Sequence, residues 1–243
     1  MSVVRFSNVF YRAGGREILS GLEFDLEEGR TLVLLGRSGS GKTSALKMVN
    51  ALLLPTAGQV LVQERATTDW NRIELRRRIG YVIQETGLFP HFTVARNVGV
   101  VPRLNGWPPE RIEARVADLL ARVGLPPEIY AARYPRELSG GQRQRVGVAR
   151  ALAADPPILL FDEPFGALDP VTRHEVRREF TALARDLGKT ILFVTHDVRE
   201  AIELGDYIGV LHEGKLEELL PATEFRQARS TEARAFLDCL RDD

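Results

Sequence analysis

Cysteine is almost missing from this sequence. The 243 residues contain a single cysteine, Cys239, close to the end of the chain. One thiol excludes an internal disulfide framework of the kind that holds small secreted domains together, and it fits a reducing compartment. We expect Cys239 to be chemically inert.

An excess of charge of one sign and long hydrophobic runs are missing as well. The 33 lysines and arginines balance 33 aspartates and glutamates, so we expect no broad basic face for nucleic acid. The longest apolar runs, such as TLVLL and ILLF, are far shorter than the roughly 20 residues that cross a bilayer. The start, MSVVRFSNVF, lacks the pattern of a secretory signal. We expect a chain that does not cross a membrane by itself but can bind a protein that does.

The chain does contain short apolar segments that alternate with helical patterns. TLVLL, PILLF and TILFV are almost continuously apolar, as central strands of a parallel sheet are when both faces are covered. Helical patterns occur at residues 42–50, 109–123, 142–153, 171–187 and 198–204. This alternation predicts βαβ units and an α/β fold in which helices flank a parallel sheet.

Other parts of the chain depart from this pattern. VVRFSNVFYR, GLEFDLEEG and YIGVLHEGKLEELL alternate in polarity and predict antiparallel strands along one edge. We expect a single domain, residues 1–243, made of a core (about 1–92 and 155–220), an inserted helical subdomain (about 93–154) and a short helical tail (about 221–243). The hairpin after VLVQ reads ERATTD, and since it lacks the glycine usual in a tight turn, we expect a longer loop.

The segment GRSGSGKT, Gly36 to Thr43, fits the pattern G-x-x-x-x-G-K-[ST] between an apolar strand and a helical pattern. Its glycines let backbone N–H groups converge on the α- and β-phosphates of a nucleotide. Lys42 is placed to reach the β- and γ-phosphates, and the Thr43 hydroxyl to ligate Mg²⁺. The alternative, a flexible loop with an unrelated lysine, leaves the flanking strand and helix unexplained. The candidate ATP-binding residues of this loop are Gly36, Arg37, Ser38, Gly39, Ser40, Gly41, Lys42, Thr43 and Ser44.

Two carboxylates end another buried strand, PILLFDEP. Asp162 is placed to hold Mg²⁺, and Glu163 to orient or deprotonate the attacking water. His196 follows the apolar strand ILFV, and strand ends of an open parallel sheet face one ligand crevice, so we expect it near the γ-phosphate. Solvent-facing acids and a structural histidine are the alternatives, and the P-loop upstream favours the catalytic interpretation.

The stretch LSGGQ, Leu138 to Gln142, precedes a long helical pattern. Serine and glycine favour a helix N-cap, and a helix N-terminus offers N–H groups and a positive dipole end to an anion. The stretch therefore predicts either an ordinary helix cap or a second anion site, one without a lysine.

Together these motifs resemble the ATP-binding-cassette (ABC) transport ATPases over nearly the whole chain, and LSGGQ is the signature sequence of that family. The resemblance implies that Gln84 in YVIQE contacts Mg²⁺ and the γ-phosphate, and that Asp169 in GALD belongs to the D-loop. Tyr11 matches the aromatic position that stacks on adenine, with packing on an edge strand as the alternative. The resemblance thus implies catalytic residues Glu163, His196 and Gln84, Mg²⁺ ligands Thr43, Gln84 and Asp162, and signature residues Leu138, Ser139, Gly140, Gly141 and Gln142.

In that family two cassettes pack head to tail, and the signature of each caps the ATP held by the other. The second anion site would then need no lysine, because the partner's Lys42 supplies the charge. The implied partners are a second copy of the chain, transmembrane permease subunits and, indirectly, a solute-binding protein. The resemblance also implies ATP and Mg²⁺ as ligands and a peripheral position at the cytoplasmic face of the cell membrane.

The stretches VVPRLNGWPPERIEARV and VGVARALAADPP resemble the importer cassettes that energise uptake of osmoprotectants: glycine betaine, choline, carnitine or proline. Importers of polar amino acids, sulfonates or nitrate are alternatives, as is, more remotely, an ABC ATPase that acts on nucleic acid or ribosomes. Many osmoprotectant cassettes continue into a pair of regulatory CBS domains. This sequence stops at Asp243, so we do not expect gating by ionic strength through such a pair.

The segment TGLFPHFTV places Leu88, Phe89 and Phe92 beside glycine and proline. We expect part of this apolar surface to be exposed and to receive a short helix of a membrane partner. The alternative is that these side chains cover the core of the helical subdomain.

Overall fold

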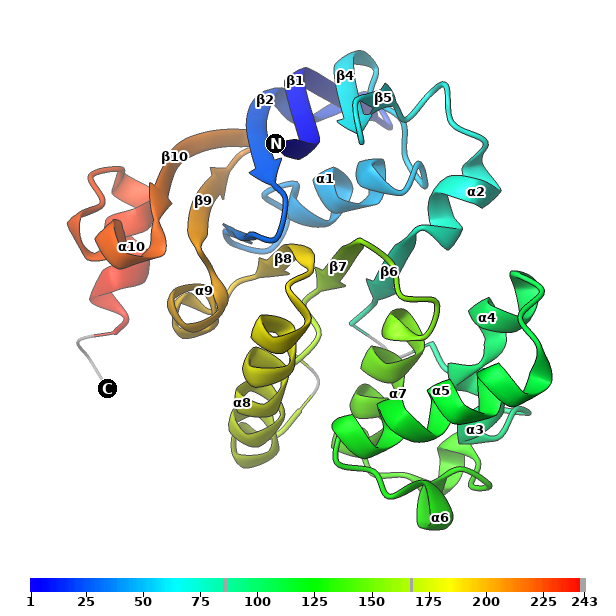
Figure 1. Ribbon diagram of the computed structural model, residues 1–243. Helices are drawn as coiled ribbons and strands as arrows, with labels where there is room; N and C mark the ends of the chain where they lie inside the picture. The colour runs from blue at the N-terminus through cyan, green and yellow to red at the C-terminus, as the bar shows by residue number, and fades with distance from the viewer. Residues whose placement is uncertain (85–86, 167, 241–243) are drawn as a thin grey trace. The chain divides into compact units, whose positions relative to one another are not determined.

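The computed structural model describes residues 1–84, 87–166 and 168–240 (Figure 1). The chain forms two compact units. One consists of Met1–Arg76 with Lys189–Asp243, and the other of Arg77–Gly188. The boundaries expected for the core, the helical subdomain and the tail remain predictions.

The first unit contains an antiparallel sheet with the strand order β2–β1–β4–β5. The strands are β1 (Ser2–Ala13), β2 (Arg16–Glu27), β4 (Ala57–Val62) and β5 (Arg65–Ala66). Alternate side chains of β1 and β2 are buried on one face, where the rings of Phe6 and Phe24 stack with their centroids 4.4 Å apart. This pairing confirms that the two alternating segments at the start of the chain are antiparallel strands. The expectation that they share one edge with YIGVLHEGKLEELL was wrong, because β1 and β2 lie in one sheet with β4 and β5, whereas the strands Tyr207–His212 and Lys215–Pro221 belong to another sheet.

The same unit contains parallel strands. β3 (Thr31–Leu35) lies between β8 (Thr190–Thr195) and β9 (Tyr207–His212) and runs parallel to both, while β10 (Lys215–Pro221) is antiparallel to β9. Every residue of β8 is buried, as its continuous apolar run predicts. The remaining elements are α1 (Lys42–Val49), α2 (Arg72–Arg77) at the division between the units, α9 (Val198–Leu204), the 3₁₀ helix η2 (Ala222–Gln227) and α10 (Thr231–Asp238).

The hairpin between β4 and β5 contradicts our expectation of a long loop. Val62 pairs with Arg65, so the loop is only Gln63 and Glu64, with φ values of 50° and 62°. Two successive left-handed residues make a tight turn of type I′, for which glycine and asparagine are usual. The expectation was wrong because the turn is set by pairing with β1: Val4 pairs with Val62, and the Gln63 N–H donates to the Val3 carbonyl at 2.8 Å.

In the second unit, β6 (Ile79–Val82) pairs in parallel with β7 (Ile158–Asp162), which is buried along its whole length. Phe161 of β7 packs on Phe180, with ring centroids 4.5 Å apart. The helices are α3 (Val94–Val98), α4 (Val100–Leu104), α5 (Pro109–Arg122), α6 (Pro127–Tyr130), α7 (Gly140–Leu152) and α8 (Pro170–Leu187), with a 3₁₀ turn η1 (Pro135–Glu137). In Figure 1 α3 and α5 lie beside α7, and all three pairs are in contact.

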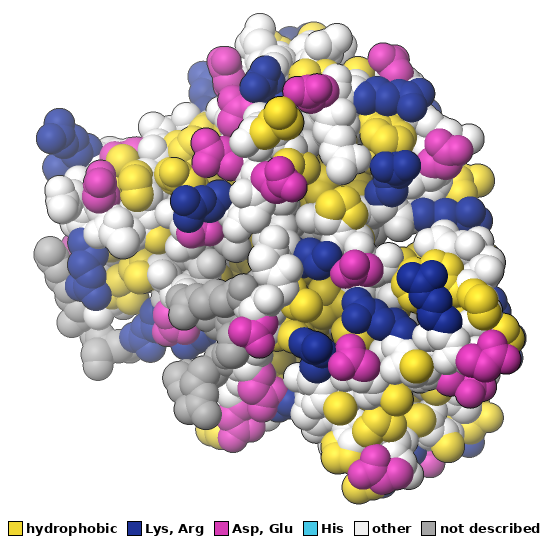
Figure 2. Space-filling model, in the orientation of Figure 1, with side chains coloured by type: hydrophobic (Ala, Val, Ile, Leu, Met, Phe, Trp, Pro, Cys, Tyr) yellow, Lys and Arg dark blue, Asp and Glu magenta, His cyan; other side chains and the backbone are white. Residues whose placement is uncertain are grey.

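The α/β fold and the five helices predicted from the sequence are confirmed, with boundaries that differ by at most two residues. Within the described ranges, no helix combines the length and apolarity needed to cross a bilayer. Basic and acidic side chains are interspersed over the face drawn in Figure 2, in keeping with the balanced charge.

Candidate functional site

The loop between β3 and α1 is built on glycines that no other residue could replace without movement. A Cβ on Gly36 would lie 2.3 Å from the Leu211 carbonyl oxygen. Gly41, the N-cap of α1, has a φ of 104°, and a Cβ there would lie 2.7 Å from Cδ2 of Leu19. The loop is therefore pressed against β2 and β9, and its backbone N–H groups can approach a ligand without an intervening side chain.

Lys42 is buried at the first position of α1, with only 3% of its surface exposed. Its Nζ donates hydrogen bonds to the carbonyls of Gly36 at 2.7 Å and Arg37 at 2.9 Å, so the ammonium group folds back over the loop. Within the described residues, the buried Oγ of Ser40 has no hydrogen-bond partner. A buried hydroxyl without a partner needs an explanation, and a phosphate oxygen held by this loop and the N-terminus of α1 would supply one.

His196 follows the end of β8, beside the start of this loop. Thr195 pairs with Leu35, the last residue of β3. His196 and Gly36, which follow these two residues, therefore stand at neighbouring strand ends. The junction is held on both sides of the exposed histidine. The Thr195 hydroxyl donates to Glu200 at 2.5 Å, and the Asp197 carboxylate accepts from the N–H groups of the first turn of α9. The expected adjacency of these two strand ends is confirmed.

Tyr11 lies one strand away from the same loop. It is half-buried on β1 and pairs with Leu19 of β2, the residue against which Gly41 is pressed. The stacking role expected for Tyr11 stays a prediction.

In the second unit, Asp162 ends β7 and is 8% exposed. The hydroxyl of Tyr81 on β6 donates to its Oδ2 at 3.1 Å. Burial, followed by the nearby Asp162 carboxylate, raises the pKa of Tyr81 well above its usual value. The sequence analysis missed Tyr81, because only the structure shows that its strand pairs with β7.

Glu163 follows directly in an unusual backbone conformation, with a φ of 46°. For a residue with a Cβ this left-handed region is uncommon and strained, and such residues cluster at functional sites. The Gly166 N–H donates to the Glu163 carbonyl at 3.2 Å. A Cβ on Gly166 would lie 3.5 Å from Nε2 of Gln84, so the exposed Gln84 amide is close to the loop that follows Glu163.

Asp169 stands directly before α8. Its Oδ1 accepts from the Thr172 N–H at 3.1 Å, and the hydrogen bonds from Thr172 hold its pKa below the usual range. Asp169 therefore caps this helix in its ionised form. Two residues of the expected motifs, Glu85 in YVIQE and Ala167 in GALD, lie outside the described residues.

The signature stretch forms the N-terminus of α7. Ser139 is its N-cap: Oγ accepts from the Gln142 N–H at 3.3 Å, and Oε1 of Gln142 accepts from the Ser139 N–H at 2.9 Å. Nε2 of Gln142 donates to the Tyr130 hydroxyl at 3.1 Å, which fixes the orientation of the amide. Ser139 and Gly140 are exposed, while Leu138 and Gly141 are buried. The helix cap is confirmed, and because Oγ is the acceptor in it, the hydroxyl proton can be donated elsewhere.

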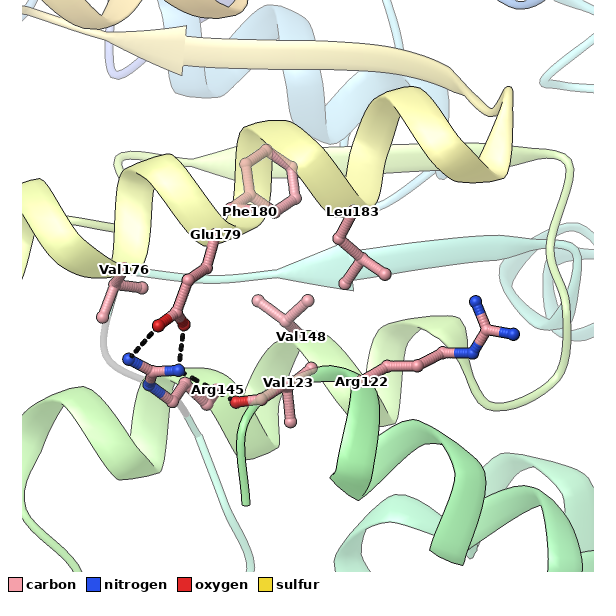
Figure 3. A pocket seen from close by; sticks show the side chains of 8 residues that line it. All are labelled: Arg122, Val123, Arg145, Val148, Val176, Glu179, Phe180 and Leu183. Carbon is pink, nitrogen blue, oxygen red and sulfur yellow. Dashed lines mark hydrogen bonds and ion pairs between the residues drawn. The ribbon is translucent and has the colours of Figure 1, made fainter. Parts of the chain in front are cut away.

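A cavity between helices of the second unit is too small for a substrate. Its volume is about 20 Å³, roughly the space of one water. Beside it Arg145 is paired with Glu179 and donates to the Val123 carbonyl at 3.0 Å, as Figure 3 shows. This contact stabilises the packing of α7 on α8. The lining residues are Arg122, Val123, Arg145, Val148, Val176, Glu179, Phe180 and Leu183.

A glycine loop between a parallel strand and a helix, with a buried lysine at the first helical position, defines the P-loop class of nucleotide-binding proteins. The family model described as ABC transporter matches residues 19–166. The chain belongs to the ABC transporter family.

Its relatives narrow the comparison. It is 48% identical to the glycine betaine/carnitine/choline transport ATP-binding protein OpuCA of Bacillus subtilis over 220 residues, 87% of this chain and 58% of the relative. It is 48% identical to the osmoprotectant import ATP-binding protein OsmV of Salmonella typhimurium, over 84% of this chain and 56% of the relative. The chain thus spans less than two thirds of the length of these two relatives. A solved dimeric ATP-binding cassette bound to ADP and Pi matches with a TM-score of 0.79 and 33% identity, over 90% of this chain and 98% of the other.

Proposed function

We propose that this chain is the ATP-hydrolysing subunit of an ABC importer that takes up an osmoprotectant such as glycine betaine, choline, carnitine or proline. The observation that carries the ATPase part is the geometry of the loop at Gly36–Gly41, with the buried Lys42 behind it and His196 at the neighbouring strand end. The names of the two relatives support the class of solute.

In this proposal the residues Gly36 to Ser44 bind the phosphates of ATP. Lys42 exchanges its two carbonyl partners for phosphate oxygens, and the Ser40 hydroxyl gains the partner that it lacks among the described residues. Tyr11 stacks on the adenine, and its pairing with Leu19, the residue in contact with Gly41, supports that role.

The hydroxyl of Thr43, the carboxylate of Asp162 and the amide oxygen of Gln84 are the ligands we propose for Mg²⁺. These hard oxygen donors fit the ion. When bound, Mg²⁺ neutralises negative charge on the β- and γ-phosphates. Tyr81 holds the Asp162 carboxylate, Glu163 orients and deprotonates the attacking water, and His196 contacts the γ-phosphate.

We further propose that two copies of the chain hydrolyse ATP together. Leu138 to Gln142 of one copy would cap the nucleotide bound to the other copy, with the Ser139 hydroxyl donating to the γ-phosphate of that nucleotide. Asp169 would belong to the neighbouring D-loop. The match to a solved dimeric cassette supports this arrangement. The dimer would bind permease subunits at the cytoplasmic face of the membrane, and through them a solute-binding protein would deliver the solute.

Uptake of labelled solute tests the function. Cells that produce this chain together with candidate permease subunits are compared with cells that produce Lys42→Ala in its place. Uptake of glycine betaine or choline that requires Lys42 supports the proposal. If a polar amino acid, a sulfonate or nitrate is taken up instead, the proposed role as the ATPase of an importer stands and the proposed class of solute is wrong. ATP hydrolysis without uptake of any solute, stimulated by nucleic acid or ribosomes, would contradict the importer.

A further inference from the structure

A buried carboxylate on the last helix is tied to the P-loop. Glu232 lies in the first turn of α10 and is 6% exposed. Its Oε1 accepts a hydrogen bond of 2.6 Å from Nε of Arg37, and its Oε2 lies 3.6 Å from Nδ1 of His212 at the end of β9. A carboxylate removed from water to this extent requires charged or hydrogen-bonding partners. The position of the Arg37 side chain is therefore fixed by its hydrogen bond to Glu232.

The backbone carbonyl of Arg37 also accepts the hydrogen bonds that hold the P-loop together. This carbonyl accepts from Nζ of Lys42 at 2.9 Å and from the Ser40 N–H at 3.2 Å. The side chain of one residue thus binds α10, and its backbone binds the lysine and the serine that we propose to contact phosphate.

The anchor for this contact is firm on the side of the helix. Ser230 caps α10 by accepting from the Ala233 N–H at 3.2 Å. The Glu218 carboxylate on β10 accepts from the N–H groups of Arg229 and Ser230 at 2.9–3.0 Å. Phe225, in the segment that leads to the helix, is fully buried. The Arg37 side chain, by contrast, is 67% exposed and makes its described ion pair with Glu232. The contact therefore constrains the loop more than the helix.

We propose that Glu232 is a positioning residue for phosphate binding. It holds Arg37, and through the Arg37 carbonyl it keeps Lys42 and Ser40 in the geometry that receives the phosphates. This inference rests on the proposed function, because it takes the P-loop as an ATP site. Glu232, which would contribute to nucleotide affinity, lies 195 residues from Arg37 in the sequence and beyond residues 19–166, which the family model matches.

The test is a double-mutant cycle on ATP binding, measured by calorimetry with the full chain. Glu232→Gln keeps the shape of the side chain but removes its charge, and Arg37→Gln removes the other partner. We expect each single variant to weaken ATP binding about 5-fold, the size of one ion pair. The double variant should bind no more weakly than Arg37→Gln, because the two residues act through one contact. Asp25→Asn is the matched control: it breaks the exposed pair with Arg5 at 2.7 Å, on the antiparallel sheet of the same unit, and should leave ATP affinity unchanged.

Hydrogen exchange of the Ser40 amide separates positioning from a general loss of stability. That N–H is bonded to the Arg37 carbonyl, so its exchange should rise several-fold in Glu232→Gln while the amides of β8 stay protected. Wild-type ATP affinity in Glu232→Gln, losses that multiply in the double variant, or unchanged Ser40 exchange would each overturn the inference. If Glu232→Gln does not fold, Arg37→Gln carries the same exchange test on an exposed side chain. A wild-type chain that binds no ATP would contradict the proposed function, whereas the Ser40 exchange would still decide the role of Glu232.

Discussion

The hydroxyl of Tyr81 donates a hydrogen bond of 3.1 Å to Oδ2 of Asp162 across the parallel pair of β6 and β7. Burial raises the pKa of Tyr81 above its ordinary value, so this hydroxyl stays protonated, and hence a donor, in the neutral range and beyond it at alkaline pH. Its contribution to stability should be fully present below about pH 10, the ordinary tyrosine pKa, and should be lost only as the pH rises further. The hydroxyl thus orients a carboxylate that we propose as a metal ligand.

Tyr81→Phe should therefore raise the Mg²⁺ concentration needed for half-maximal ATP hydrolysis about 10-fold, since partners behind a metal ligand typically contribute 10- to 100-fold in affinity. Titration of the ATPase activity with Mg²⁺ measures the shift, and the melting temperature without nucleotide shows whether folding is affected. A Mg²⁺ dependence identical to that of the wild type would remove Tyr81 from the site.

Glu163→Gln should retain ATP binding while hydrolysis falls by orders of magnitude. The amide has nearly the shape of the carboxylate but cannot take a proton from water. Single-turnover hydrolysis and calorimetric ATP binding, measured on the same preparation, separate chemistry from affinity. Near-normal turnover in this variant would show that another group activates the water.

Tyr11→Ala should weaken ATP binding, and Tyr11→Trp should largely preserve it, because stacking of a base on an aromatic ring contributes about 1–3 kcal/mol. The affinity for ATP is compared with the affinity for inorganic triphosphate, which has no base and should bind both variants like the wild type. Equal loss of ATP affinity in the two variants would favour the packing role on the edge of the antiparallel sheet.

Phe89 is 41% exposed, so the prediction that part of its segment lies on the surface is confirmed. The fully buried Asn97 holds this loop through bonds of 2.8 Å from the Phe89 N–H and 3.1 Å to the Phe89 carbonyl. Phe89→Glu should abolish solute uptake and leave basal ATP hydrolysis and the melting temperature near wild-type values, while Phe89→Leu should retain uptake. A large drop in melting temperature for Phe89→Glu would instead assign the ring to the core of its own unit.

The helices and the P-loop could be predicted because their signals are local. The apolar period of residues 109–123 and the contiguous GRSGSGKT need no knowledge of what packs against them. Contacts between distant segments could not be predicted in this way. Tyr81 and Asp162 are 81 residues apart, and Arg37 and Glu232 are 195 apart. Each pair meets only because particular elements of the fold lie side by side, an order that residue types do not encode locally.

The prediction of a longer loop in place of the short turn at Gln63 and Glu64 was wrong for a related reason. Local preference argues against left-handed glutamine and glutamate, but the pairing of β4 with β1 on one side and with β5 on the other leaves only two residues for the loop. Tertiary pairing outweighed the local cost. Ser139 was the opposite case, because a helix cap and its Gln142 partner are three residues apart, so the cap could be predicted from the sequence alone.

The most direct measurement concerns Ser139 at the exposed N-terminus of α7. Sedimentation of Glu163→Gln with and without ATP should show a shift from monomer toward dimer, because hydrolysis is stopped while nucleotide stays bound. Adding Ser139→Arg removes the hydroxyl and places a bulky cation where the partner's phosphate must enter. This double variant should bind ATP with the affinity of the lone chain and remain monomeric. Loss of ATP binding by the monomeric double variant, or ATP-driven dimers that form in spite of Ser139→Arg, would contradict a signature that caps the nucleotide of a second copy.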